Sequence, residues 1–102
     1  MSPDGRVRAA ELHVLRGNMY RTALSDLNAA ASEFARAERL GGPLGAEATY
    51  LRGTCLEALG NRRAALEAYE RYLSTPRRPR AAEVRRRIAA LSVSSQAIEQ
   101  AP

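Results

Sequence analysis

The sequence predicts an all-α fold in which antiparallel helical hairpins stack on one another. Its 102 residues suit a single domain with a small core. Alanine and leucine supply much of the apolar content, and the only aromatic residues are four tyrosines and one phenylalanine, which favours helices over strands. Apolar residues also recur at helical spacing between turn signals, and one stretch of the chain repeats another.

Turn signals at 25–26, 41–43, 60–61 and 75–79 separate five predicted helices. The helices are expected over 5–24, 26–40, 44–59, 61–74 and 80–91. Gly41 is a natural C-terminal stop, and Asn61 can cap the helix that follows it. The last residues, 92–102, lack periodicity and are expected to form a disordered tail.

Apolar side chains define one stripe on each predicted helix. In chain order the stripes contain Val7, Ala10, Val14 and Gly17; Leu27, Ala30, Phe34 and Ala37; Ala48, Leu51, Cys55 and Leu59; Ala65, Tyr69, Tyr72 and Leu73; and Ala81, Val84, Ile88 and Leu91. On the last helix this arrangement leaves Arg86 on the side that faces solvent.

The chain contains an internal duplication. Residues 10–17 match 46–53 at five of eight positions with an offset of 36, and beyond Gly17 the offset becomes 35. The second offset pairs Asp26 with Asn61, Ala30 with Ala65, and Phe34 with Tyr69. The sequence therefore predicts a duplicated helical hairpin followed by one extra helix.

The duplicated unit resembles the tetratricopeptide repeat, whose pattern is Gly-x2-aromatic or Leu, then Ala-x3-aromatic, then Pro. The second unit carries this pattern in Gly53, Leu56, Ala65, Tyr69 and Pro76, and the first in Gly17, Tyr20, Ala30 and Phe34. The resemblance implies a short α-solenoid domain over 1–91, with units at about 10–43 and 46–79 and a capping helix at 80–91. Ser25 departs from the family, which has Gly in this turn.

Two glycines lie inside predicted helices, where each costs about 1 kcal/mol relative to Ala. This cost is offset if Gly17 and Gly53 let paired helices approach closely, with Phe34 and Tyr69 filling the space beside them. A rival register treats Gly17 and Asn18 as the first turn, but it makes the spacing to the next unit ten residues too long and ranks second.

Positive charge is concentrated near the end of the chain. All 16 basic residues are arginine, and the segment 76–91 contains six arginines and one glutamate, so that it carries the whole formal charge of +5. The six are Arg77, Arg78, Arg80, Arg85, Arg86 and Arg87. Three interpretations remain open: a solvated cap on the stack, a site for an acidic protein, and a nucleic-acid site, which ranks last because no aromatic residue is interleaved for base stacking.

No pattern in the sequence indicates catalysis. Cys55 is the only cysteine and lies on an apolar stripe, which favours a buried structural role, and His13 is the only histidine. Phosphate loops, serine elbows and paired acids are absent from the sequence, and Glu67 with Arg71 is predicted to be an ordinary surface pair. We therefore expect no enzyme activity, no cofactor and no metal.

The resemblance implies a protein-protein interaction module, either an adaptor or a small chaperone-like scaffold, in which the first helix of each unit lines a concave groove for a peptide. Mapped by motif position, the groove would be lined by Val14, Asn18, Arg21, Tyr50, Thr54, Glu57 and Arg86. Some family members hold a C-terminal carboxylate, but only Asn18 and Arg87 fall at suitable positions for this here.

Two units are fewer than the three or so that stacked repeats usually need, so we expect the chain to self-associate or to join a larger complex. The contact surface is predicted at the first helix, through Val7, Val14, Leu15 and Met19. The start of the chain has no apolar leader, and no run approaches the ~18 apolar residues of a membrane span, which predicts a cytoplasmic protein.

Overall fold

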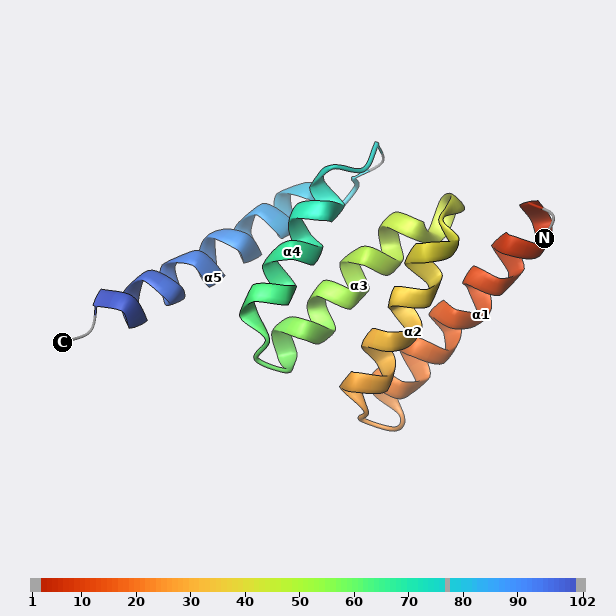
Figure 1. Ribbon diagram of the computed structural model, residues 1–102, viewed down its shortest axis with the longest axis horizontal. Helices are drawn as coiled ribbons and strands as arrows, with labels where there is room; N and C mark the ends of the chain where they lie inside the picture. Colours follow the sequence, from red (N-terminus) through yellow and green to blue (C-terminus); the bar gives the residue numbers. More distant parts are fainter. Residues whose placement is uncertain (1–2, 77, 101–102) are drawn as a thin grey trace.

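The computed structural model describes the backbone of residues 3–76 and 78–100 and the side chains of 4–76 and 78–93. Among these residues the structure has helices joined by turns and no strand, which confirms the predicted all-α class (Figure 1). In chain order the helices are α1 (Pro3–Thr22), α2 (Leu27–Leu40), the short 3-10 helix η1 (Gly42–Leu44), α3 (Gly45–Ala58), α4 (Arg62–Leu73) and α5 (Ala81–Gln100).

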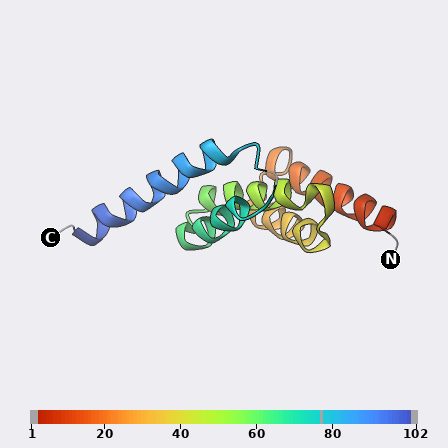
Figure 2. The same ribbon diagram turned by 90° about the horizontal axis from the view of Figure 1, so that it is seen from above.

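Each helix from α1 to α4 packs against the next, and α5 packs on α4. Figure 1 shows them side by side in chain order, with α1 and α5 at opposite ends of an elongated molecule that measures 55 × 32 × 18 Å. Seen from above, α1, α3 and the start of α5 lie on one side, and α2 and α4 lie on the other (Figure 2). The two hairpins therefore stack as two layers of helices.

Two clusters of buried side chains hold the stack together. The larger one runs through both hairpins to α5, and its most bulky members are Phe34, Tyr50, Tyr69, Tyr72 and Val84. The smaller one lies where the hairpins meet and consists of Ala10, Ala37 and Ala48. Because alanine side chains are small, the helices of the two units approach closely at this boundary.

A glycine in contact with an aromatic ring fixes the packing within each hairpin. A Cβ atom added to Gly17 would lie 2.5 Å from Cε1 of Phe34, and one added to Gly53 would lie 2.6 Å from Cε1 of Tyr69. Both distances are far below van der Waals contact, so the ring occupies the space that any other side chain would need. The predicted close approach is confirmed, and the rival register is wrong because α1 continues through Gly17.

The turns inside the two hairpins are closely related. Asp26 caps α2 by accepting from the N–H of Ala29, and Asn61 caps α4 by accepting from the N–H of Ala64. Ser25 has a φ of 50° at the place where the second turn has Gly60, with a φ of 80°. A left-handed conformation is unfavourable for a residue with a Cβ, so the first turn is the more strained of the two.

The one-residue slip of the repeat lies in these turns and not directly after Gly17. The N–H of Asp26 donates to the carbonyl of Tyr20, and the N–H of Asn61 donates to that of Leu56. Tyr20 and Leu56 are 36 residues apart, whereas Asp26 and Asn61 are 35 apart. The offset of 36 therefore holds along α1 and α3, and the first turn contains the extra residue.

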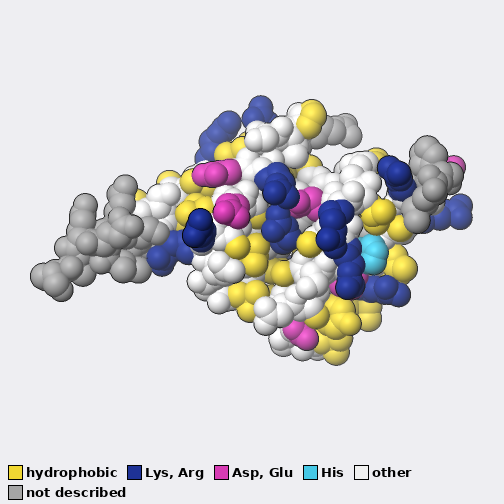
Figure 3. All heavy atoms as spheres, viewed as in Figure 1, with side chains coloured by type: hydrophobic (Ala, Val, Ile, Leu, Met, Phe, Trp, Pro, Cys, Tyr) yellow, Lys and Arg dark blue, Asp and Glu magenta, His cyan; other side chains and the backbone are white. Residues whose placement is uncertain are grey.

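Glu38 connects the two units through ion pairs. Its carboxylate lies 3.2 Å from Nη2 of Arg52 on α3 and 2.5 Å from Nη1 of Arg71 on α4. Figure 3 shows basic and acidic side chains side by side over the middle of the molecule. The predicted pair of Glu67 with Arg71 is wrong, because the exposed Arg71 pairs with Glu38 of the other unit and Glu67 lies near Arg63.

Burial alone raises the pKa of Glu38, but the Thr49 hydroxyl and the two arginines outweigh it, and the pKa is lowered overall. A carboxylate with a lowered pKa in the folded state adds stability above its unfolded pKa, and this contribution is lost as the pH falls through the folded value.

Three further expectations differ from the structure. Helix α5 continues to Gln100, where a disordered tail was expected, because no glycine or proline interrupts the chain between Leu91 and Gln100. Residues 101–102 lie outside the described part of the chain. Leu59 is exposed because α3 ends one residue before it. Val7 and Val14 of the predicted contact surface are half-buried, because they lie on the core side of α1.

We predict that Gly53→Ala lowers the free energy of unfolding by about 1–3 kcal/mol, because the new methyl group displaces the Tyr69 ring. The matched control is Gly45→Ala, where the nearest atom to a new Cβ is the Glu38 carbonyl oxygen at 4.0 Å. Thermal melts should show no loss for the control. Equal melting temperatures for the two variants would contradict the close contact.

We also predict that Glu38→Gln destabilises the protein by about 1–2 kcal/mol at pH 7, since two arginines lose their charged partner. The difference from the wild type should shrink as the pH falls below the ordinary glutamate value of 4.5 and vanish as it passes the lower pKa of folded Glu38, because Glu38 is then neutral in both states. Melting curves at pH 7 and pH 3 measure this. Glu67→Gln, which changes an exposed carboxylate, should have little effect at either pH.

Candidate partner-binding face

The seven residues predicted to line a groove do not all lie on one open surface. On α1, Asn18 is half-exposed and Arg21 is exposed, and the Arg21 guanidinium donates to Oδ1 of Asn18 at 3.0 Å. Val14 instead packs against both buried clusters. Asn18 and Arg21 are therefore available to a partner, whereas Val14 belongs mainly to the core.

Tyr50 is not a surface residue, since only 7% of it is exposed. Its ring lies 5.9 Å from the ring of Tyr72, and the Arg80 guanidinium covers it at 4.5 Å from the ring centroid. The backbone N–H of Arg80 donates to the Tyr72 hydroxyl at 2.8 Å. The prediction of Tyr50 as a binding residue is wrong in this structure, because the start of α5 and the turn before it cover its ring.

Glu57 of α3 forms polar contacts with both α4 and α5. It accepts a hydrogen bond of 2.6 Å from the Tyr69 hydroxyl and lies 3.1 Å from Nη1 of Arg87 on α5. Burial and the adjacent Glu57 carboxylate raise the pKa of Tyr69, so the phenol stays protonated and donates. The residue of α5 that reaches α3 is thus Arg87, whereas the predicted Arg86 is exposed and points away from the core.

Five side chains form what we call the odd-helix face: Asn18, Arg21, Thr54, Glu57 and Arg87. All are half-exposed or exposed, and they come from α1, α3 and α5. Helix α1 contacts α3 directly, and the charge of Arg21 acts against the burial that raises the pKa of the Cys55 thiol on α3. The Glu57–Arg87 pair continues the row to α5.

Most of the described arginines in the basic segment have partners within the protein. Arg80 pairs with Glu47 at 3.0 Å, Arg87 pairs with Glu57, and Arg78 donates to the Leu73 carbonyl. Arg85 and Arg86 are exposed, and Arg77 lies outside the described residues. The sequence suggested a common role for these arginines, but the structure divides them into side chains that attach α5 to the stack and side chains that face solvent.

The helical register contained a signal for this division. Arg80 and Arg87 are seven residues apart and flank the apolar stripe that contains Val84 and Ile88, so both lie near the packed side of α5. Their carboxylate partners lie about thirty residues earlier in the chain, on α3. The sequence alone does not show which face of α3 they meet.

Neither the lone cysteine nor the lone histidine forms part of an open site. Cys55 is buried, and His13 Nδ1 lies 2.7 Å from the buried Glu33, which also pairs with Arg36. The described residues contain no group of three or more His, Cys, Asp or Glu side chains that could hold a metal ion. Within that same part of the chain, no helix is both long and apolar enough to cross a membrane.

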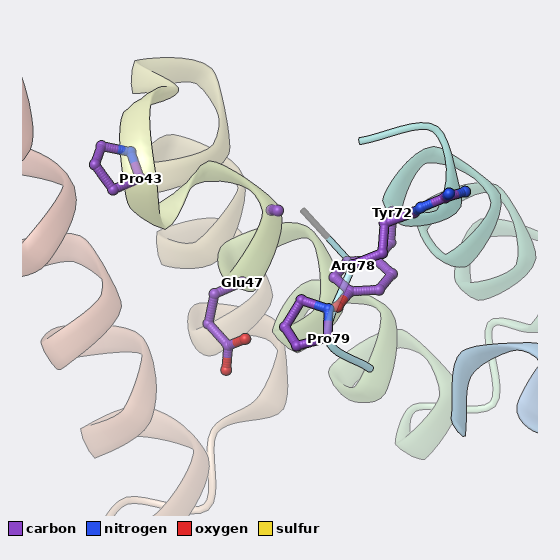
Figure 4. Close-up of a pocket in the computed structure, with 6 residues that line it drawn as sticks. Pro43, Glu47, Tyr72, Arg78 and Pro79 are labelled. Carbon is purple, nitrogen blue, oxygen red and sulfur yellow. The ribbon is translucent and has the colours of Figure 1, made fainter. Parts of the chain in front are cut away.

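An open cleft of about 470 Å³ lies beside the first turn of α3 (Figure 4). It is lined by Pro43, Ala46, Glu47, Tyr72, Arg78 and Pro79. Glu47 provides the carboxylate in the lining of this cleft, and it is already paired with Arg80. The lining contains no nucleophile beside a base. The cleft therefore adds no catalytic arrangement to the site.

Comparison of the chain with protein-family models, with curated proteins and with solved structures gives no match. The resemblance to tetratricopeptide repeats therefore remains a prediction from the motif residues.

We predict that Tyr69→Phe costs about 1 kcal/mol of stability, because it removes only the hydroxyl that donates to Glu57 and leaves the ring on Gly53. Tyr69→Ala should cost roughly 3 kcal/mol or more, since the whole buried ring is lost. Denaturant unfolding of the two variants separates these contributions. If Tyr69→Phe were as damaging as Tyr69→Ala, the hydrogen bond and not the ring would determine the packing.

Proposed function

We propose that this chain is a non-enzymatic interaction module that binds an acidic peptide segment of a partner protein across the odd-helix face. The observation that supports this most directly is the charge balance. Glu47, Glu57 and Glu83 each lie within ion-pair distance of Arg80 or Arg87. Arg21, in contrast, has no carboxylate partner among the described residues and bonds only to Asn18.

The chemistry of the face suits a peptide. The Asn18 amide can both donate to and accept from a peptide main chain, and Arg21 can pair with a carboxylate through two parallel hydrogen bonds. Glu57 and Arg87 are held by each other and by Tyr69, so this part of the face is already ordered before a partner binds. Ordering before binding lowers the entropic cost of association.

Nucleic acid is the alternative partner, through the exposed Arg78, Arg85 and Arg86. We rank it second because Arg80 and Arg87 are already paired with carboxylates, which reduces the charge available for phosphates. Binding that releases counterions from six to ten phosphates falls by about 10³ to 10⁵ between 50 and 200 mM salt. Peptide binding at one or two charged positions should fall far less.

The proposal predicts that the 102-residue chain binds acidic members of an array of short peptides and that Arg21→Glu weakens this binding at least about tenfold, or about 1.4 kcal/mol. Fluorescence anisotropy with the tightest-binding peptide, at low and high salt, measures the loss. The matched control is Arg63→Glu on α4, which makes the same charge change at an almost fully exposed side chain.

Arg63→Glu should leave the affinity nearly unchanged. If both variants weakened binding equally, overall charge and not the odd-helix face would be responsible. If acidic peptides failed to bind while a single-stranded oligonucleotide bound with a steep salt dependence, the nucleic-acid function would replace the one proposed.

A further inference from the structure

The outer side of α1 exposes a row of large apolar side chains. Leu12, Leu15 and Met19 are 44%, 58% and 52% exposed. Their spacing places them on one side of the helix, opposite the buried Ala10 and Gly17. Figure 3 shows hydrophobic side chains at the edge of the molecule where α1 lies. We call Leu12, Leu15, Met19 and the adjacent Arg16 the α1 outer surface.

The internal repeat shows what kind of structure covers such a surface. With the offset of 36, Leu12, Leu15 and Met19 correspond to Ala48, Leu51 and Cys55 of α3. Those three residues are only 0%, 8% and 1% exposed. They lie in the buried clusters that α3 shares with the first hairpin. The α1 outer surface therefore corresponds to a surface of α3 that the preceding hairpin covers.

The charged part of the surface repeats as well. Arg16 corresponds to Arg52, which forms its ion pair with Glu38 on the second helix of the preceding hairpin. Arg16 is exposed and has no ion pair among the described residues. The α1 outer surface therefore presents both the apolar row and the arginine of a hairpin-docking site.

We propose that the α1 outer surface docks an α-helical hairpin of a partner protein, and that the second helix of this hairpin carries small residues and a carboxylate opposite Arg16. The small residues correspond to Ala37, which packs against Ala48 at the internal boundary. The carboxylate corresponds to Glu38. This surface lies on a different side of α1 from Asn18 and Arg21, so the two sites are separate.

A second copy of this chain does not provide the required surface. In its last hairpin, the residue that corresponds to Glu38 is Leu73, which has no carboxylate. Helix α5 also covers that end of the hairpin, with Val84 in the same cluster as Tyr72 and Arg80 bonded to the Tyr72 hydroxyl. Its first hairpin presents Glu38 only toward its own α3 and α4.

The test uses the first hairpin of the chain itself as the probe. In the extended chain an added copy of residues 3–44 is joined directly to Ala9 of the natural sequence. Ala9 corresponds to Gly45 at the offset of 36, so it follows the added Leu44 just as Gly45 does in the natural chain. This places an added Glu38 opposite Arg16. We expect a single cooperative unfolding transition with a melting temperature at least about 5 °C above that of the natural chain.

Leu15→Asp distinguishes docking from simple attachment. In the natural chain Leu15 is 58% exposed, so the substitution should shift the melting temperature only slightly. The extended chain contains Leu15 twice, and the added hairpin is expected to cover the original one. Leu15→Asp at this original position should abolish the rise in melting temperature, and Glu38→Gln in the added hairpin should reduce it. Two separate transitions, or an equal effect of Leu15→Asp in both chains, would overturn the proposal.

Sedimentation of the natural chain at micromolar concentration provides an independent check. A monomer is the expected result, because a second copy lacks the carboxylate. A dimer that Leu15→Asp disperses would show that a second copy occupies the surface and would also overturn the proposal. Neither experiment involves Arg21 or an acidic peptide, so their outcomes are independent of the proposed function.

Discussion

The fold depends on the contact between a helix glycine and an aromatic ring, which occurs once in each hairpin. Phe34 lies against Gly17 and Tyr69 lies against Gly53 so closely that no other side chain fits at the glycine. Each contact sets both the distance between the two helices and their register. The two contacts are alike, so the same constraint acts within each hairpin. The fully buried Ala30 and Ala65 allow the same close approach from the partner helix.

Polar contacts between the units then determine which side chains remain available. Glu38 pairs with Arg52 and Arg71, Glu47 pairs with Arg80 just before α5, and Glu57 pairs with Arg87 on α5. Buried or half-buried charges of this kind need partners, so the chain's own carboxylates take up much of its positive charge. The arginines left over, among them Arg16 and Arg21, are the ones to which we assign partners. The two proposed sites thus follow from the way in which the stack satisfies its internal charges.

Features determined by nearby residues could be predicted from the sequence. The duplication, the cap at Asn61 and the role of Gly53 are encoded within one hairpin, and the structure confirms the last two. Features that depend on how the hairpins stack were missed. Tyr50 was expected on a groove but is covered by Tyr72 and Arg80, which lie twenty or more residues later. Arg71 was assigned a neighbour on its own helix, whereas its partner, Glu38, belongs to the other unit. Neither partner can be deduced from helix periodicity, because periodicity does not give the angle between helices.

A double-mutant cycle between positions 53 and 69 tests the central constraint most directly. If the Tyr69 ring occupies the space of the missing Gly53 side chain, Gly53→Ala should be costly in the wild type and nearly neutral once Tyr69 is replaced by the smaller leucine. Urea unfolding of the wild type, both single variants and the double variant gives the coupling energy. We expect a coupling of about 1–3 kcal/mol, which lies within the range of about 0.5–3 kcal/mol for residues in direct contact. Additive effects of the two substitutions would contradict the account, because they would show that the ring and the glycine do not share one space.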